Sequence, residues 1–234
     1  SCSRSLPAPF KSMEYGEGNR PVTAQNRPSR VIASPPKRLL DDFFKIDEVR
    51  VSYERFDGTM SAERRFLIFE RGDAAAALLH DPERRKIIAV NQFRMPTREK
   101  GKGRGWLVEA VAGMIETDKS GLQRETPEEC IKREVFEETG YQLTNLTKIA
   151  RFFSSPGGST ELVHLYYARV SQLAQTGKGG GLKEDGEEIQ VVEYDIDEFL
   201  KMLNAGEFED PKLIIAGQWF SERKRSEPAQ FGDV

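Results

Sequence analysis

The chain of 234 residues carries 35 lysines and arginines against 38 aspartates and glutamates, and this net charge of −3 excludes nucleic-acid or membrane binding through bulk electrostatic attraction. With 38% hydrophobic and 31% charged residues, it can bury a core as one large domain or as a domain with a small appendage. Two cysteines, Cys2 and Cys130, are too few for a disulfide framework and fit a reducing compartment. No apolar run approaches the roughly 20 residues of a membrane-spanning helix, and the first ten residues lack the apolar stretch of a signal peptide. We therefore expect a cytoplasmic protein that binds neither nucleic acid nor membrane.

The N-terminal part of the chain changes character near residue 37. Residues 1–36 are rich in serine, proline and arginine and show no apolar periodicity, so we expect a flexible extension. Alternating apolar residues then predict a strand over 46–53, an Asp-Gly turn over 56–59 and a second strand over 65–69. We expect residues 37–70 to form a small antiparallel β-subdomain, which has to dock on another surface because two or three strands are marginal alone.

Residues 71–223 contain the remaining predicted elements, and charged residues from Ser221 lead into a tail at 224–234. Apolar runs at 74–79 and 87–90 predict central strands separated by a turn over 80–83, which contains His80. A polar, glycine-rich loop at 98–105 precedes a strand at 106–112, and further strands are expected at 146–153, 162–170 and 189–194. Asp195 is expected to cap a helix over 196–204, and a last helix covers 213–220. This order predicts an α+β chain with a mixed sheet flanked by helices.

The most informative segment is a predicted helix over 127–139. Thr126 suits the N-cap, Pro127 the first helical position, and Glu129 stands three residues after the cap, where it can close a capping box. Gly140 follows the last turn, where a left-handed residue ends a helix without steric cost. The sequence therefore predicts both ends of this helix.

Three carboxylates share one face of this helix, because Glu134, Glu137 and Glu138 are three and four residues apart. Like charges at that spacing destabilise an isolated helix, so a counter-charge from outside is expected. Ile131 and Val135 form an apolar stripe that fixes the acidic face by packing. The face is either solvated or binds a hard divalent cation such as Mg²⁺, which prefers carboxylate and carbonyl oxygens.

The segment from Gly113 to Tyr141 resembles the signature of the Nudix hydrolases, G-x5-E-x7-R-E-U-x-E-E-x-G-U, in which U is a bulky apolar residue. The run from Arg133 to Tyr141 matches the second half at every polar position, and Glu125 keeps the expected distance from Arg133. The departure is upstream, where eleven residues separate Gly113 from Glu125, and we interpret residues 118–124 as an inserted loop.

The resemblance implies an α/β/α Nudix sandwich and a set of site residues. Glu134 and Glu138 are expected to bind Mg²⁺, for which Mn²⁺ could substitute, together with the Ala112 carbonyl and Glu125. Glu137 is a weaker ligand candidate with a catalytic role. Gly113, Arg133 and Gly140 are expected to be structural, with Arg133 paired to Glu125 or to a neighbouring glutamate.

In relatives that cleave ADP-ribose, a glutamate from a loop after the signature is proposed as the general base. The corresponding loop here follows three glycines, Gly179 to Gly181, which make a hinge plausible. We favour Glu187 as the base, with Glu184 and Glu188 as rivals, and the alternative is a solvated acidic loop.

Substrate contacts are expected from two further regions. Arg94 follows a strand and is either a phosphate clamp or part of a surface salt bridge. Glu109 either binds a ribose or base, or forms a buried pair with an arginine. The loop around Pro156 and Gly157 resembles the loop of ADP-ribose pyrophosphatases, and with residues 160–164 and the glycine-rich acidic loop it resembles GDP-mannose pyrophosphatases.

The expected activity is Mg²⁺-dependent hydrolysis of a nucleoside diphosphate sugar to a nucleoside monophosphate and a sugar phosphate, with ADP-ribose and GDP-mannose as leading substrates. A non-catalytic module that senses sugar nucleotides is the alternative, although such a module would normally lack some of the signature carboxylates. The N-terminal sheet and the Pro156 loop disfavour mRNA decapping or oxidised-nucleotide removal. The resemblance also implies a homodimer formed through the N-terminal sheet.

Overall fold

The computed structural model describes residues 28–118, 123–181 and 188–231. Its backbone contacts divide the chain into two compact units. The first contains the residues up to Arg38 together with Glu48–Leu67, and the second contains Leu39–Asp47 and the residues from Ile68 onward. In the described parts of the chain, no helix is both long and apolar enough to cross a membrane.

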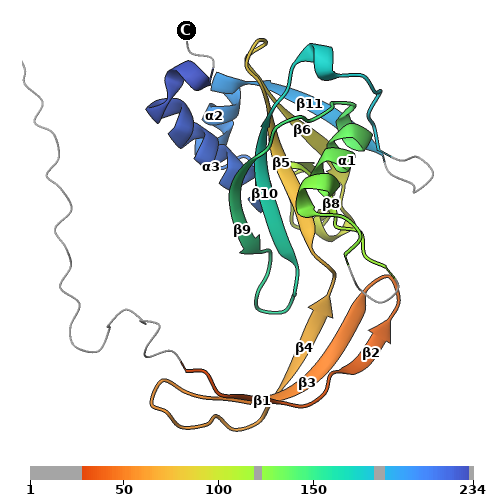
Figure 1. Cartoon of the computed structure of the whole chain (residues 1–234), viewed down its shortest axis with the longest axis vertical. Helices are drawn as coiled ribbons and strands as arrows, with labels where there is room; N and C mark the ends of the chain where they lie inside the picture. Colours follow the sequence, from red (N-terminus) through yellow and green to blue (C-terminus); the bar gives the residue numbers. More distant parts are fainter. Residues whose placement is uncertain (1–27, 119–122, 182–187, 232–234) are drawn as a thin grey trace, which may run out of the picture. The chain divides into compact units, whose positions relative to one another are not determined.

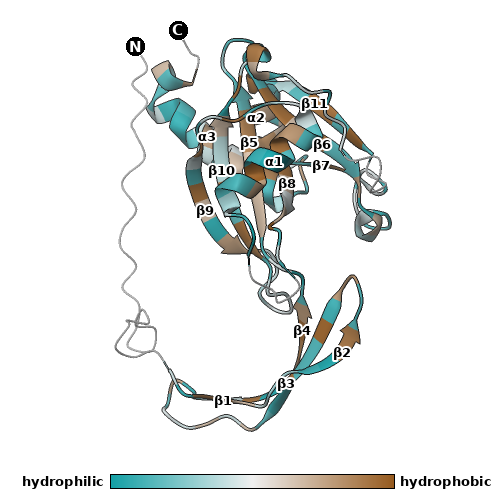
Figure 2. Cartoon of the chain, turned by 45° about the vertical axis from the view of Figure 1, so that its right-hand side comes forward, coloured by the Kyte–Doolittle hydropathy of each residue, from teal (hydrophilic) through white to brown (hydrophobic). Residues whose placement is uncertain are grey.

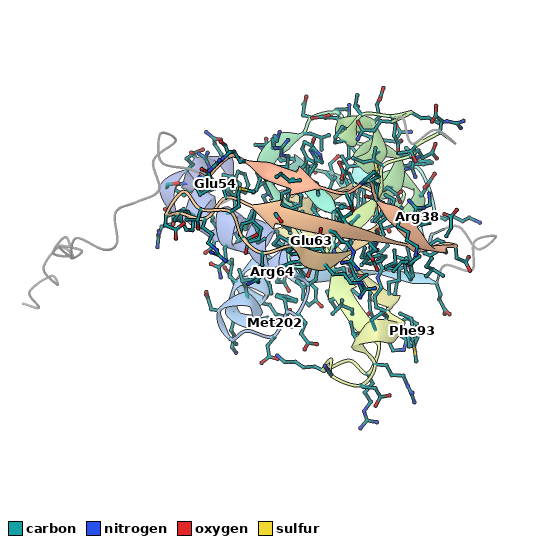
Figure 3. All side chains as sticks on the ribbon, turned by 90° about the horizontal axis from the view of Figure 1, so that it is seen from below. Arg38, Glu54, Glu63, Arg64, Phe93 and Met202 are labelled. Atoms are coloured by element: carbon teal, nitrogen blue, oxygen red, sulfur yellow. The ribbon has the colours of Figure 1, made fainter. Side chains whose placement is uncertain are left out.

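An antiparallel sheet of four strands occupies the N-terminal region: β1 (Val31–Ala33), β2 (Lys37–Asp41), β3 (Lys45–Tyr53) and β4 (Arg64–Glu70). β1 lies inside the segment expected to be a flexible extension and pairs with β3. The predicted Asp-Gly turn is confirmed, because Gly58 has a φ of 82° and the Asp57 carboxylate accepts hydrogen bonds from the Thr59 amide and hydroxyl. Figure 3 shows the charged side chains of Glu54, Glu63 and Arg64 on this part of the chain.

The second unit is built on a mixed sheet of seven strands (Figure 1). β11 (Ile189–Asp195), β6 (Lys86–Phe93), β5 (Ala74–Asp81), β10 (Leu162–Arg169) and β9 (Thr147–Phe153) follow one another across it. β7 (Trp106–Glu109) pairs with β6, and β8 (Val111–Met114) pairs with β5. The β5–β10 pair is parallel, and the other pairs are antiparallel.

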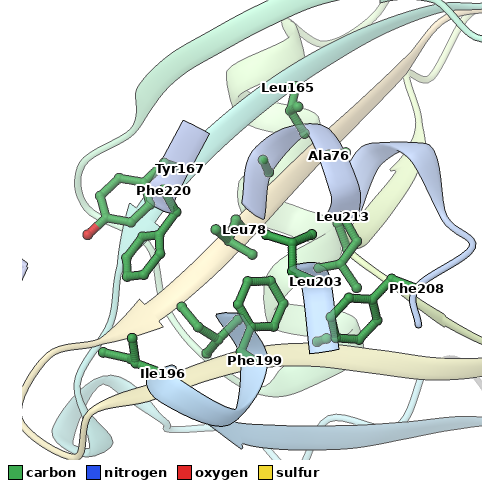
Figure 4. Packing of buried hydrophobic residues seen from close by; sticks show 14 of the residues in the cluster. Ala76, Leu78, Leu165, Tyr167, Ile196, Phe199, Leu203, Phe208, Leu213 and Phe220 are labelled. Atoms are coloured by element: carbon green, nitrogen blue, oxygen red, sulfur yellow. The ribbon is translucent and has the colours of Figure 1, made fainter. Parts of the chain in front are cut away.

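Helices cover both faces of this sheet, which confirms the predicted α/β/α sandwich with its mixed sheet. α1 (Pro127–Thr139) packs on one face, while α2 (Ile196–Asn204) and α3 (Pro211–Ser226) pack on the other. Along β5, Ala75, Ala77 and Leu79 face α1, whereas Ala76 and Leu78 face α2 and α3. Both faces of β5 are therefore apolar, as its colouring in Figure 2 shows. Figure 4 shows the α2 and α3 side, where aromatic and leucine side chains interdigitate.

Four sequence-based expectations need correction. His80 does not lie in a turn: β5 continues through Asp81, the turn occupies 82–85, and the His80 side chain is fully buried. The strand expected at 106–112 is split at Ala110, whose amide donates to Asp210 Oδ2 at 3.0 Å, so the chain moves from β6 to β5. Asp195 occupies the N-cap position of α2 without a side-chain cap bond, because its carboxylate pairs with Lys86 at 3.1 Å. The charged residues from Ser221 to Ser226 continue α3 instead of starting a tail.

Candidate active site on the acidic helix

The ends of α1 agree with the predicted signals. Thr126 Oγ1 accepts from the Glu129 amide at 3.2 Å, and Glu129 Oε2 accepts from the Thr126 amide at 2.7 Å, which completes the capping box. Pro127 is the first helical residue, and Gly140 ends the helix with a φ of 78°. Ile131 and Val135 are fully buried against the sheet, so the rotation of the helix is fixed and its carboxylates project in one direction.

Three carboxylates surround the guanidinium of Arg133. Its Nη2 and Nε donate to the two oxygens of Glu125 at 2.7 and 3.2 Å, and its Nη1 donates to Glu134 Oε1 at 2.8 Å and Glu137 Oε2 at 3.1 Å. This hydrogen bonding lowers the pKa of the Glu125 carboxyl, which keeps it ionised. One positive charge thus faces three negative charges, and the acidic group retains a net charge of −2.

The end of β8 lies directly against this group. The carboxyl of Glu134 packs on the backbone of Gly113 so closely that a Cβ at Gly113 would lie 1.9 Å from the carboxyl carbon. Arg133 Nη2 also donates to the Met114 carbonyl at 3.4 Å, and the Cys130 thiol lies 3.4 Å from the same oxygen. A side chain at 113 would therefore displace the carboxyl of Glu134 from this position. Ala112, the predicted carbonyl ligand, immediately precedes Gly113 in β8.

The glycines after β10 meet the C-terminal end of α1. The Gly180 amide donates to the Glu138 carbonyl at 2.8 Å, and the Gly181 amide donates to the Glu137 carbonyl at 3.2 Å. Gly179, Gly180 and Gly181 all have positive φ, so this path suits glycine. The side chain of Glu138 is buried on the same helix. These bonds hold Gly180 and Gly181 against the end of the helix that carries the carboxylates.

Of the three candidate general bases, Glu184 and Glu187 lie outside the described residues. Glu188 is exposed immediately before β11 and lines a pocket of about 540 Å³ with Asn91, Trp106, Ile189 and Gln190. Sequence reasoning missed Trp106 and Asn91, since only the pairing of β6 with both β7 and β11 brings them beside Glu188.

The two predicted substrate residues Arg94 and Glu109 contact each other. Arg94 Nε donates to Glu109 Oε2 at 2.6 Å, and Glu109 is buried. Lys212 Nζ, at the start of α3, donates to Glu109 Oε1 at 3.1 Å and to Asp210 Oδ1 at 2.7 Å. The buried pair with an arginine, one of the two alternatives for Glu109, is therefore present. Lys212 and Asp210 were missed because they lie about 100 residues further along the chain.

The Pro156 loop connects β9 to β10 and is exposed at Pro156 and Gly157. Its Gly158 carbonyl accepts from the Phe69 amide at 2.7 Å, and Ser159 forms a parallel bridge with Phe69. These contacts tie the loop to Phe69 near the end of β4.

The donor chemistry of the acidic group fits a magnesium ion. In the described part of the chain, no three histidine, cysteine, aspartate or glutamate side chains converge to form a metal cage by themselves. Mg²⁺ is usually held by one or two carboxylates, with waters and substrate phosphates completing its shell. Three carboxylates that share one guanidinium and lie against the backbone of β8 meet that requirement.

Comparison with known proteins places this geometry in a family. The NUDIX domain pattern matches residues 70–215. The GDP-mannose pyrophosphatase of Cronobacter sakazakii (strain ATCC BAA-894) is 34% identical over 179 residues, which cover 76% of this chain and 88% of that protein. The GDP-mannose pyrophosphatase of Escherichia coli (strain K12) is 32% identical over 179 residues with the same coverage. The match covers more than half of the chain and includes the acidic helix, so this protein belongs to the Nudix hydrolase family.

Proposed function

We propose that the protein is a Mg²⁺-dependent pyrophosphatase that hydrolyses GDP-mannose to a nucleoside monophosphate and a sugar phosphate. The observation that carries this proposal is the acidic group at α1, in which the carboxylates of Glu125, Glu134 and Glu137 share the guanidinium of Arg133. A diphosphate is cleaved when its charge is neutralised and a water is activated, and such a carboxylate group is suited to recruit the cation for both tasks. The names of the relatives favour GDP-mannose over ADP-ribose.

Each site residue has a role in this proposal. Glu134, Glu138, Glu125 and the Ala112 carbonyl would hold Mg²⁺, or Mn²⁺ in its place, and the bound ion would neutralise phosphate charge and lower the pKa of a coordinated water. Arg133 holds Glu125 and Glu134 against the end of β8, with Glu137 at the edge of the group. Glu187, or its rivals Glu184 and Glu188, would accept the proton of the attacking water.

Substrate contacts are assigned to residues outside the acidic helix. Arg94 would bind the diphosphate, because a guanidinium offers paired donors to phosphate oxygens. Glu109 orients Arg94 through the 2.6 Å contact. Pro156 and Gly157 would contact the sugar or base from their exposed loop.

The activity is tested with GDP-mannose, ADP-ribose, ADP-glucose and a nucleoside triphosphate, each incubated with Mg²⁺ and with a chelator. Phosphatase coupling then reports the released phosphomonoesters. We expect Mg²⁺-dependent cleavage of GDP-mannose first and ADP-ribose second. Cleavage of the triphosphate alone would contradict the substrate class, and tight GDP-mannose binding without turnover would favour a sensing module.

The N-terminal sheet supports a further proposal, that two copies associate through it. Of the hydrophobic side chains in β1 to β4, Val49 alone is buried, and Val31 and Ile32 are 63% and 68% exposed. Such apolar area in contact with water is typical of an interaction surface. We expect a dimer by sedimentation velocity at micromolar concentration, and a monomer after Ile32→Ser with Leu40→Ser. A wild-type monomer would contradict this proposal.

A further inference from the structure

A buried row of alternating charges crosses from α3 to the loop after β6. Asp210, Lys212, Glu109 and Arg94 follow one another, with contacts of 2.7, 3.1 and 2.6 Å between successive members. Asp210 is 1% exposed and Glu109 is 5% exposed, so the middle of the row is shielded from water. The row contains no residue of the Nudix signature in α1. It ends at Arg94, the arginine proposed to bind phosphate.

Arg94 is held in a way that leaves part of its guanidinium available. Its backbone amide donates to the Gly105 carbonyl at 2.6 Å, and its carbonyl accepts from Thr97 at 2.9 Å, so the main chain is fixed. Its Nε donates to Glu109, whereas its two terminal nitrogens donate to no partner among the described residues. With 38% of its side chain exposed, Arg94 therefore presents four N–H groups to a ligand from a fixed position.

Lys212 fixes the carboxylate on which Arg94 rests. Burial alone would raise the pKa of the Glu109 carboxyl, but the Lys212 ammonium and the Arg94 guanidinium outweigh burial, so its pKa is lowered. Burial alone would lower the pKa of Lys212, but Asp210 and Glu109 outweigh it and raise that pKa. Both groups stay charged at neutral pH. Because Lys212 occupies Oε1 of Glu109, Oε2 remains for Arg94.

The fold ties this row to the neighbouring loop as well. Asp210 accepts from the amides of Lys212 and Leu213 and so caps α3, and it also accepts from the Ala110 amide next to Glu109. Lys102, in the loop after Arg94, donates its amide to Glu209 at 2.8 Å and its Nζ to the Gly206 carbonyl at 2.7 Å. The segment before α3 therefore contacts both the loop that follows Arg94 and the residue that follows Glu109.

We propose that Lys212 is a positioning residue for phosphate recognition, acting through Glu109 on the guanidinium of Arg94. This inference rests on the proposed function for the identity of the ligand, a nucleoside diphosphate group. The side-chain ammonium of Lys212 contacts Glu109 and Asp210. It sets the direction in which Arg94 presents its free donors, so its loss weakens diphosphate binding even though Arg94 is intact.

The test is a double-mutant cycle on GDP binding, measured by isothermal titration calorimetry with a chelator present so that hydrolysis and metal binding do not contribute. We expect Arg94→Ala and Lys212→Met each to weaken GDP binding about tenfold, the size of one lost charge-assisted hydrogen bond. The double variant is expected to bind no more weakly than either single variant, because both changes remove the same contact. Lys201→Met, an exposed lysine on α2, is the matched control and should leave binding unchanged.

Two further variants keep the inference testable if Lys212→Met unfolds. Lys212→Arg retains the charge and should retain GDP binding within about threefold, whereas Glu109→Gln should lose as much as Lys212→Met. Additive losses in the double variant, or a folded Lys212→Met protein with wild-type GDP affinity, would overturn the inference. Cleavage of the sugar nucleotides is measured separately. An absence of turnover would reject the proposed function, whereas the role of Lys212 is tested by GDP binding alone.

Discussion

The protein contains two ion-pair groups that differ in charge balance. Around Arg133, three carboxylates share one guanidinium, and their side chains are 14–25% exposed. Around Lys212, two carboxylates alternate with two cations, and Glu109 and Asp210 are 7% exposed or less. Buried charges need nearly complete compensation, whereas an excess charge is tolerated where a counter-ion can enter. Under the proposed function, the first group would receive a cation, whereas the second would hold side chains in place.

The largest expected effect comes from removing the charge of Glu138, the other predicted metal ligand on α1. Glu138→Gln keeps the shape of the side chain but removes its charge, and we expect the turnover of GDP-mannose to fall by more than the roughly 10–100-fold that loss of an outer-sphere partner costs. The melting temperature should change little. Steady-state kinetics at saturating Mg²⁺ provide the measurement.

Glu129→Gln is the matched control for this experiment. It lies on the same helix, and glutamine can also complete the capping box, so activity should be preserved. Retained Mg²⁺-dependent turnover in Glu138→Gln would contradict the metal assignment.

The next largest expected effect comes from disrupting the group around Lys212, in which two cations balance two carboxylates. Asp210→Ala removes the cap of α3 and leaves Lys212 with half of its compensation, and we expect a loss of about 3 kcal/mol in the free energy of unfolding. Chemical denaturation measures the change. Asp195→Ala is the control, since that aspartate makes no side-chain cap bond and its ion pair is exposed, and it should cost less than about 0.5 kcal/mol. Equal losses of unfolding free energy in the two variants would contradict the expectation that the buried Asp210 contributes more stability than the exposed Asp195.

These two groups also show how far the sequence alone can lead. The acidic group could be predicted because its members lie within one helix and one preceding loop, and caps at Thr126 and Gly140 are local signals. The Lys212 group could not, because 103 residues separate Glu109 from Lys212 and no periodicity links them. The break at Ala110 has the same origin, since its partner Asp210 comes from the start of α3.

Other differences arise where tertiary contacts override a local preference. Asp195 has the residue type and position of an N-cap, but Lys86 on the neighbouring strand competes for its carboxylate. His80 precedes an Asp-Pro turn signal, yet the parallel pairing with Arg169 extends the strand through it. The strands of the sheet were predictable because their apolar runs are continuous or alternate regularly.

The pH dependence of the free energy of unfolding reports on His80, a buried group outside the two ion-pair groups. Burial, more than the nearby Arg169, lowers the pKa of His80 from its usual 6.5 to about 4. The unfolded chain therefore takes up a proton first, and stability falls as the pH drops from 6.5 toward 4, by about 2 kcal/mol at pH 5. The lowered pKa values of the Glu109 and Glu125 carboxyls reduce stability only as the pH falls below about 4.5, their pKa in the unfolded chain.

We expect His80→Gln to flatten the stability profile between pH 7 and 5, as measured by urea denaturation. His164→Gln is the control, because the other histidine is only half-buried and its pKa is lowered less. The His80 ring lies 5.0 Å from Phe220, and its Nδ1 is 2.7 Å from the Tyr167 hydroxyl, so the variant also loses stability at neutral pH. An unchanged slope with pH would contradict the assignment.

The smallest expected effect is the change in stability on removing Arg133, and its response to Mg²⁺ can be compared with that of a Lys212 variant. Arg133→Met leaves Glu125, Glu134 and Glu137 without their shared guanidinium, and because that guanidinium is 30% exposed we expect a loss of about 1–2 kcal/mol in the free energy of unfolding. Mg²⁺ should restore much of this loss, since the cation supplies the missing positive charge to oxygens that suit it. Lys212→Met should be destabilised without recovery in Mg²⁺, because Asp210 and Glu109 are buried and a hydrated cation does not reach them. If Mg²⁺ restored the free energy of unfolding equally in both variants, the expected difference between the Arg133 group and the Lys212 group would be contradicted.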